Sequence, residues 1–332
     1  MGMKGFKGFE KDFSCKGKQY EENTTYEEHG VGCCHEGVMH FCEDPWEVLN
    51  HYDLVDGNGN FSEFAEVEAL GQVWNDGEER ATNKIHIGAK LGLKGFLKAC
   101  IDFTLEKTKY ESNGTNLSGN SAKIGSSGYS AKIGSSGNSA QIGSSGNSAQ
   151  IGSSGYSAQI GSSGYSAQIG SSGDSAQIGS SGDFAQIGSS GDSAQIGSSG
   201  DYAKIGSSGN SAKIGSSGDY AKIGSSGNSA KIGSSGDFAQ IGSSGDSAQI
   251  GSSGNSAKIN STGEDAVIMC AGSRSKAKGK KGSWITLAEW VKDEEKGRYV
   301  PVCVKTERVD GEKIKEDTYY TLKNGEFVEV EE

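Results

Sequence analysis

Five side chains that can bind a metal ion lie close together near the N-terminus: Cys33, Cys34, His35, His40 and Cys42. Thiolates and imidazoles are preferred zinc ligands, and structural zinc sites usually draw them from two separated Cys-x-x-Cys-like pairs. The cluster has no such pairs, and two adjacent cysteines do not easily bind one ion together. We therefore predict ordinary reduced thiols. A metal site formed by Cys34, His40 and Cys42 is the alternative.

A short basic run could bind phosphate or nucleic acid. Its members are Arg274, Lys276, Lys278, Lys280 and Lys281. The segment before it, residues 120–263, carries seven Lys and seven Asp, so the net charge of −11 resides on the ends of the chain. A neutral segment does not imitate a nucleic acid, and we do not expect nucleic acid as a partner. We interpret the run as a solvated cap, with anion binding as the alternative.

A column of aromatic residues is the third candidate site. Phe184, Tyr202, Tyr220 and Phe238 are spaced by eighteen residues, and each replaces a serine of a nine-residue repeat. Exposed aromatic rings bind sugars or protein partners. The alternative is that rings stacked between neighbouring strands only stabilise the fold.

The repeat that carries this column has the unit x-Ser-Ala-(Lys/Gln)-Ile-Gly-Ser-Ser-Gly. Isoleucine recurs sixteen times, at every ninth residue from Ile124 to Ile259, with Ala two positions earlier. Residues i and i+2 of a strand share one face, so Ala and Ile point inward and Gly-Ser-Ser-Gly forms the turn. One nine-residue strand has nothing to pack against, whereas two units make a coil of eighteen residues. The pattern predicts a two-sided parallel β-solenoid of eight regular coils, because a disordered Gly/Ser linker would not keep these periods.

The variable position x adds a column of carboxylates beside the aromatic column. Repulsion between carboxylates one strand spacing apart is about 1 kcal/mol per pair even in water. Lys204 and Lys222 follow Asp201 and Asp219 by three residues, and we expect them to compensate this repulsion. We include these two lysines and these two carboxylates, together with the rings, in the predicted ligand- or partner-binding surface. Since x is freely Asn, Asp or Tyr, we do not predict calcium between the coils. The carboxylates are Asp183, Asp201, Asp219 and Asp237, and the lysines are Lys204 and Lys222.

The chain divides into three predicted regions: an α+β domain over 1–110, the solenoid over 111–281 and a hairpin-rich β cap over 282–332. Asp44–Tyr52 reads as a short helix with Asp44 as N-cap, Phe64–Trp74 as a strand, and the second half of Lys90–Tyr110 as a helix. Asn324-Gly325 between two alternating runs predicts a hairpin. The fold class is therefore mainly β.

Degenerate units are expected to extend the solenoid at both ends. They place Asn113 and Thr115 inward at the start. At the far end the inward pairs are Ala266 with Ile268 and Ser275 with Ala277. No apolar run is long enough for a membrane span, and the first residues lack the apolar core of a signal peptide.

Two resemblances appear outside these patterns. The two ends of the chain resemble an uncharacterised domain and tail common in bacteriophage genomes. The N-terminal segments that carry this resemblance are KGFKGFEKDFSCKGKQYEENTTYE, GVMHFCEDPWEVLNHYDL and FAEVEALG, and the C-terminal one runs from SWITLAEW to TLKNGEFVEV. This resemblance implies a phage origin and a place in the host cytoplasm or the virion. NSAKIG resembles strands in the heads of trimeric autotransporter adhesins, which are parallel β-rolls with another coil length.

An enzymatic alternative rests on a looser resemblance. Tyr20, His40 and the acids Glu66 and Glu68 are similar in order to the aromatic, His and Glu of ADP-ribosyltransferases, which would imply NAD as substrate. Lys4 stands on the first strand where that family has Arg or His.

We predict a non-enzymatic binding or structural protein of phage type, without a cofactor. Its rigid solenoid would present binding surfaces or bring several copies of them together by oligomerisation. These surfaces could sequester or block a host protein, a glycan or a small molecule. Self-association as a dimer or trimer is expected. The alternative is a trimeric virion adhesin or tail-fibre component.

Overall fold

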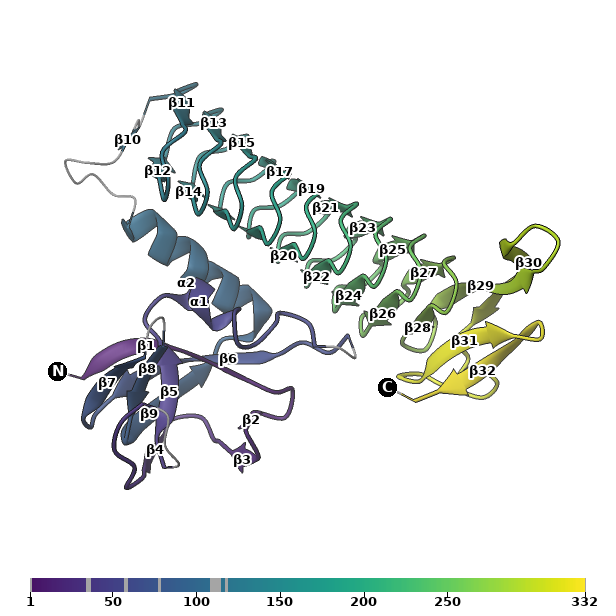
Figure 1. Ribbon diagram of the computed structural model, residues 1–332, viewed down its shortest axis with the longest axis horizontal. Coiled ribbons are helices and arrows are strands. Elements are labelled where there is room, and N and C mark those ends of the chain that lie inside the picture. The colour runs from purple at the N-terminus through teal and green to yellow at the C-terminus, as the bar shows by residue number, and fades with distance from the viewer. Residues whose placement is uncertain are drawn as a thin grey trace.

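The protein is described by a computed structural model over residues 2–33, 37–56, 59–76, 79–107, 115–116 and 119–331. A long β-solenoid forms its body (Figure 1). The N-terminal domain lies along one side of the solenoid, and two hairpins close the C-terminal end. The mainly β fold class and the solenoid are confirmed.

Strands of the solenoid alternate between two parallel sheets, in about nine turns of about 18 residues. The register is unshifted from coil to coil, so Ile205 pairs with Ile223 and Gly206 with Gly224. We call the sheet that faces the N-terminal domain the covered sheet and the other the open sheet. In the solenoid the covered sheet contains β10 (Thr115–Asn116), β12 (Lys132–Ser135), β14 (Gln150–Ser153), β16 (Gln168–Ser171), β18 (Gln186–Ser189), β20 (Lys204–Ser207), β22 (Lys222–Ser225), β24 (Gln240–Ser243), β26 (Lys258–Ser261) and β28 (Lys276–Lys278). The open sheet contains β11 (Lys123–Ser126), β13 (Gln141–Ser144), β15 (Gln159–Ser162), β17 (Gln177–Ser180), β19 (Gln195–Ser198), β21 (Lys213–Ser216), β23 (Lys231–Ser234), β25 (Gln249–Ser252) and β27 (Val267–Cys270).

Three residues of each unit, not two, point into the solenoid. In the coil around β20, Ala203, Ile205 and Ser207 are all 0% exposed. The prediction that Gly-Ser-Ser-Gly is wholly a turn is therefore wrong, because its first two residues continue the strand. From Ser144 to Ser261 the hydroxyls of the inward serines, such as Ser207 Oγ, have no hydrogen-bond partner among the described residues.

The corner between strands depends on one glycine. A Cβ on Gly209 would lie 2.0 Å from the carbonyl oxygen of Gly191 in the previous coil, so only glycine fits. Two residues later the chain enters the left-handed region, with φ of 56° at Ser211. Stacked coils thus need a glycine and then a residue that tolerates positive φ.

The degenerate units at the far end continue the solenoid as predicted. Ala266, Ile268 and Ala277 are 0% exposed, and Ser275 is 4% exposed. At the start Thr115 pairs with Ile133 in parallel register. The predicted inward residue Asn113 lies outside the described residues.

The N-terminal domain is a seven-stranded antiparallel sheet with two helices. Its strand order is β4-β9-β6-β1-β5-β8-β7, and β2 and β3 form a separate two-stranded ribbon. The strands are β1 (Met3–Phe9), β2 (Ser14–Cys15), β3 (Lys18–Gln19), β4 (Thr24–Glu27), β5 (Met39–Cys42), β6 (Glu63–Ala69), β7 (Val73–Asp76), β8 (Glu79–Thr82) and β9 (Lys84–Lys90), and the helices are α1 (Pro45–Val48) and α2 (Gly92–Lys107). The segment Phe64–Trp74 is not one strand, because the chain turns after Ala69 and β7 pairs with β8.

A local cap begins α1, and contacts between distant residues position both helices. Asp44 caps α1, with its carboxylate accepting a hydrogen bond of 2.8 Å from the backbone N–H of Trp46. Trp46 is buried and donates from its indole Nε1 to Thr104 Oγ1 of α2 over 2.8 Å. The ring of Phe96 in α2 stacks on Phe64 of β6. Helix α2 therefore bridges the N-terminal sheet and the solenoid (Figure 1).

A column of glycines lets the N-terminal domain approach the covered sheet. A Cβ on Gly188 would lie 3.2 Å from the Trp46 ring, and one on Gly206 would lie 2.9 Å from Leu97. The corresponding glycines of the open sheet, such as Gly197 and Gly215, have nothing within 4 Å of that position. Identical repeats therefore have different surroundings on the two sheets.

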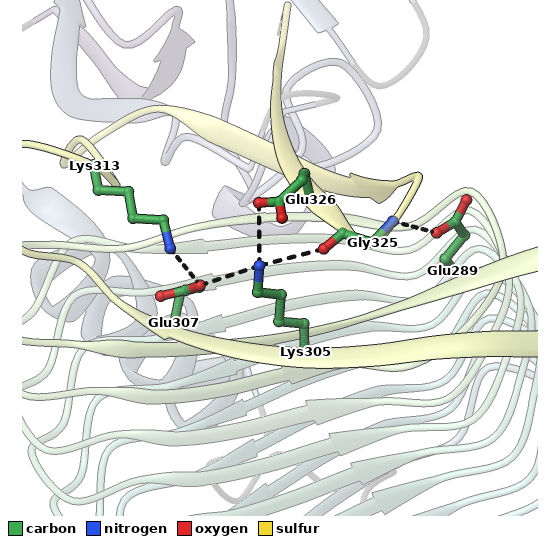
Figure 2. A network of polar contacts seen from close by, with 6 residues as sticks. All are labelled: Glu289, Lys305, Glu307, Lys313, Gly325 and Glu326. Atoms are coloured by element: carbon green, nitrogen blue, oxygen red, sulfur yellow. Dashed lines mark hydrogen bonds and ion pairs between the residues drawn. The ribbon is translucent and has the colours of Figure 1, made fainter.

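The C-terminal cap extends both sheets with hairpins, β29 (Trp284–Asp293) with β30 (Arg298–Arg308) and β31 (Tyr319–Lys323) with β32 (Glu326–Val330). The predicted hairpin is confirmed, with positive φ at Asn324 and Gly325. Polar contacts join the two hairpins (Figure 2): Glu289 accepts from the backbone N–H of Gly325 over 2.8 Å, and Lys305 lies 3.1 Å from Glu326. These contacts close the end of the solenoid.

Candidate functional site

The four predicted aromatic residues form one stack, which we call the ridge: Phe184, Tyr202, Tyr220 and Phe238. Their ring centroids are 4.8 to 4.9 Å apart and their planes differ by 3° to 5°. Each ring remains 42 to 44% exposed. The ridge runs along the corner where the chain enters the covered sheet, beside the N-terminal domain.

Ring stacking is not required for this corner to form. Tyr202 has φ of 57° and donates its backbone N–H to Asp219 O over 2.9 Å. Ser211, at the equivalent position of the other edge, has φ of 56° and donates to Asn228 O over 2.8 Å. Serine therefore supports the same backbone, and the rings are an addition to a complete coil.

Stacking also limits what the ridge can bind. Both faces of Tyr202 and Tyr220 are covered by neighbouring rings, so a sugar has no free ring face to stack on at these positions. What remains in solvent is an apolar row of ring edges with two tyrosine hydroxyls. This shape suits a protein surface better than a glycan.

The predicted carboxylates form an acidic column next to the ridge: Asp183, Asp201, Asp219 and Asp237. One oxygen of each accepts the backbone N–H of the residue eighteen positions later, over 2.7 to 2.9 Å. Backbone donors thus offset part of the repulsion that the sequence predicts.

The two lysines do not compensate the acidic column. Lys204 Nζ lies 3.1 Å from Asp53 Oδ1, and Lys222 Nζ binds the other oxygen of Asp53, both in the N-terminal domain. Their expected pairing with Asp201 and Asp219 is replaced because the strand directs them to the covered side. Lys204 and Lys222 hold the domain to the solenoid, and the acidic column keeps its charge.

A cleft of 420 Å³ separates the ridge from α1. Phe184 and Tyr202 form part of one wall, and Asp44 and Glu47 lie on the other. Lys132 and Lys204 also line the cleft, so the ridge forms one rim of a groove with charges of both signs.

A larger cavity of 930 Å³ lies within the N-terminal domain, between β1, β5, the β2–β3 ribbon and the turn after α1. Tyr20 and His40 of the enzymatic hypothesis both line it. Glu66 and Glu68 do not. Glu68 instead accepts the backbone N–H of Gly2 over 3.1 Å. The structure thus brings two of these four residues together and leaves the acids outside.

Lys7 is the cavity residue that the sequence did not single out. Its side chain is 6% exposed, and its amine donates to the carbonyl oxygen of His40 over 2.9 Å. The amine also lies 5.7 and 5.8 Å from the ring centroids of Phe9 and Tyr20. Burial lowers the pKa of Lys7, while the nearby Cys15 thiol opposes that shift. The alternation of β1 could have indicated an inward lysine, since Lys7 shares a strand face with Phe9, which is 0% exposed.

The remaining cavity groups are held in place by packing. Tyr52 donates its hydroxyl to Cys15 Sγ over 3.0 Å, and its ring contacts Gly8, where a Cβ would come within 2.7 Å. Burial raises the pKa values of Tyr20 and Tyr52, so both hydroxyls stay protonated. The cavity therefore combines a buried amine with two hydroxyl donors.

The predicted metal and anion sites are placed as follows. Cys34 lies outside the described residues, and within the described part no group of three or more His, Cys, Asp and Glu side chains could hold a metal ion. Burial raises the pKa of Cys42 to about 12, and His40 Nε2 lies 2.7 Å from Cys33 O.

The basic run is largely bound within the C-terminal cap. Lys276 donates to Glu331 O over 2.7 Å, Lys278 lies over the Tyr319 ring, and Lys280 pairs with Asp317 at 2.6 Å. Arg274 and Lys281 remain exposed. The run does not converge on one anion site.

Residues 3–99 match the model of a family described as a domain of unknown function (DUF7666). The N-terminal domain is thus similar to a family without an assigned activity. Comparison with curated proteins and with solved structures gives no match. No helix in the described part of the chain is long and apolar enough to cross a membrane.

Proposed function

We propose that the protein is a non-enzymatic binding protein in which the ridge and the acidic column beside it hold a protein partner. The partner surface would be apolar and basic, because the ridge offers ring edges next to the acidic column. The observation that carries the proposal is the exposure of four stacked rings at positions where serine builds the same corner. A phage protein of this kind would block or sequester a host factor.

Rigidity supports this function. The unshifted parallel register fixes the spacing of the rings, and the Lys204, Lys222 and Asp53 contacts fix the N-terminal domain beside them. A preorganised surface loses little conformational entropy on binding. Charged flanks add attraction that weakens as salt rises.

The test replaces all four ring residues by serine, the residue that occupies the equivalent position elsewhere in the repeat. A random displayed peptide library is then selected on the wild-type protein and on the variant. We expect wild type to enrich peptides that combine Arg or Lys with apolar residues, and the variant to lose them. Tyr156→Asn is the matched control, since it removes an exposed ring from the opposite edge. Equal enrichment by the serine variant would contradict the proposal.

Self-association is a second candidate function, favoured by the open sheet. Its glycine column is uncovered along the solenoid, and Val302 and Val304 of β30 are 54 and 64% exposed nearby. Light scattering after size exclusion decides it. A stable trimer would support a fibre component, and a monomer would remove this candidate.

A further inference from the structure

We propose that the cavity of the N-terminal domain binds a small aldehyde or ketone and that the Lys7 amine condenses with its carbonyl group. This inference is independent of the ridge. It concerns the cavity of 930 Å³ in that domain and a buried nucleophile that the proposed function does not use.

The size and lining of the cavity suit a small organic ligand. Its 930 Å³ falls within the usual range of ligand pockets, which is about 300 to 1,000 Å³. Phe6, Phe41, Tyr20 and Tyr52 supply apolar ring surface, and Lys7 lies among them. Lys16, Lys18, Glu28 and Glu79 also line the cavity, so it offers ring surface for a flat body and charged groups for a polar substituent.

The surroundings of Lys7 favour a nucleophile over a structural ion pair. Within the described residues the amine makes no ion pair, and its polar contacts are the His40 carbonyl oxygen and the Cys15 thiol. Burial has the largest influence on the Lys7 pKa and favours the neutral amine, while Cys15 and the Glu79 carboxylate oppose this shift more weakly. A lysine desolvated in an apolar pocket is a typical amine for Schiff-base formation.

The chemistry balances without a further reactant. The Nζ atom forms a bond to the carbonyl carbon, and the carbonyl oxygen leaves as water with the two protons that the amine gives up. A C=N bond remains, and nothing is oxidised or reduced. Tyr20 lines the same cavity as a protonated hydroxyl and can donate to the departing oxygen.

The test uses the full chain with carboxybenzaldehyde as the probe. Sodium cyanoborohydride at neutral pH traps the imine, and peptide mapping by mass spectrometry locates the adduct. We expect labelling of Lys7 to be at least about tenfold faster than labelling of Lys213, which is exposed on the open sheet. Benzoate, which has no aldehyde, should slow the reaction at Lys7 only.

Two results would overturn the proposal. One is labelling of Lys213 and other exposed lysines while Lys7 stays unmodified. The other is protection of the cavity by benzoate without any adduct, which would show recognition of the anion alone. Lys7→Arg should remove the adduct, because a guanidinium group does not condense with the aldehyde. Peptide mapping of the labelled wild-type protein decides the question by itself, so the test does not depend on whether the Lys7→Arg variant folds. The four-serine ridge variant should be labelled as fast as wild type, which separates this site from the proposed function.

Discussion

The covered and open sheets of the solenoid have the same repeat and opposite surroundings. Both sheets read Lys or Gln, Ile, Gly, Ser, and both bury Ile and the first Ser. On the covered sheet a Cβ added at the outward glycines would meet Trp46, Leu97 or Phe61, whereas on the open sheet it would meet nothing within 4 Å. The difference shows that the repeat builds the rod, while the N-terminal domain gives its two sides different roles.

The largest expected effect comes from filling one glycine position on each sheet. Gly206→Val should push α2 from the solenoid, because its Cβ would lie 2.9 Å from Leu97, and overpacking of this kind costs about 1 to 3 kcal/mol. Gly215→Val on the open sheet should be neutral or stabilising, since valine favours strands and the space is open. Hydrogen exchange of α2 measures the loss of docking. Equal protection in both variants would contradict the role of the glycine column.

A smaller effect is expected from the lysines. Lys222→Gln should weaken docking by about 1 kcal/mol, because it removes a half-buried contact to Asp53. Lys213→Gln on the open sheet should change nothing. Glutamine occupies the same strand position in other units, such as Gln240, so neither change disturbs the coil. In an Asp53→Asn background the effect of Lys222→Gln should disappear, and a persisting effect would show that the ion pair is not its cause.

Substitutions in the interior of the solenoid should have equal effects on stability in the two sheets. Ser207→Ala and Ser216→Ala each remove a buried hydroxyl without a partner, so each should leave stability unchanged or raise it by up to about 1 kcal/mol. The chain itself places Cys270 and Leu287 in this slot near the cap. Denaturant midpoints measure the change, and marked destabilisation of either variant would mean that these hydroxyls have a partner.

The smallest effect concerns the cap, where the hairpins that extend the two sheets meet. A hydrogen bond from Lys313 lowers the pKa of Glu307 below its ordinary 4.5, so the charged form is favoured in the folded protein. The stability from this carboxylate is therefore present above pH 4.5 and is lost as pH falls through the lowered folded value. Glu307→Gln should flatten this part of the curve of melting temperature against pH. An unchanged curve would assign the acid sensitivity to other groups.

Much of the candidate surface could be predicted from spacing alone. The interval between Phe184 and Phe238 predicted the ridge, because a strict coil length places equal positions in one column. The partner of Lys204 could not be predicted from the sequence. Asp201 lies three residues before it in the chain, whereas Asp53 comes close to it only in the folded protein. Phe64–Trp74 was predicted as one strand because its alternation continues across a turn that the sequence does not mark strongly.

By itself, the sequence determined the coil length, the inward Ala and Ile, the ridge, the Asp44 cap and the Asn324-Gly325 hairpin. These features depend on residues near in sequence or repeated at a fixed period, so local geometry specifies them. Only the tertiary structure decided which of two equal sheets is covered, that Lys204 and Lys222 meet Asp53, and that Lys7 lies buried in a cavity with Tyr20 and His40. Those outcomes depend on contacts between distant segments, for which a repetitive sequence offers many equivalent partners.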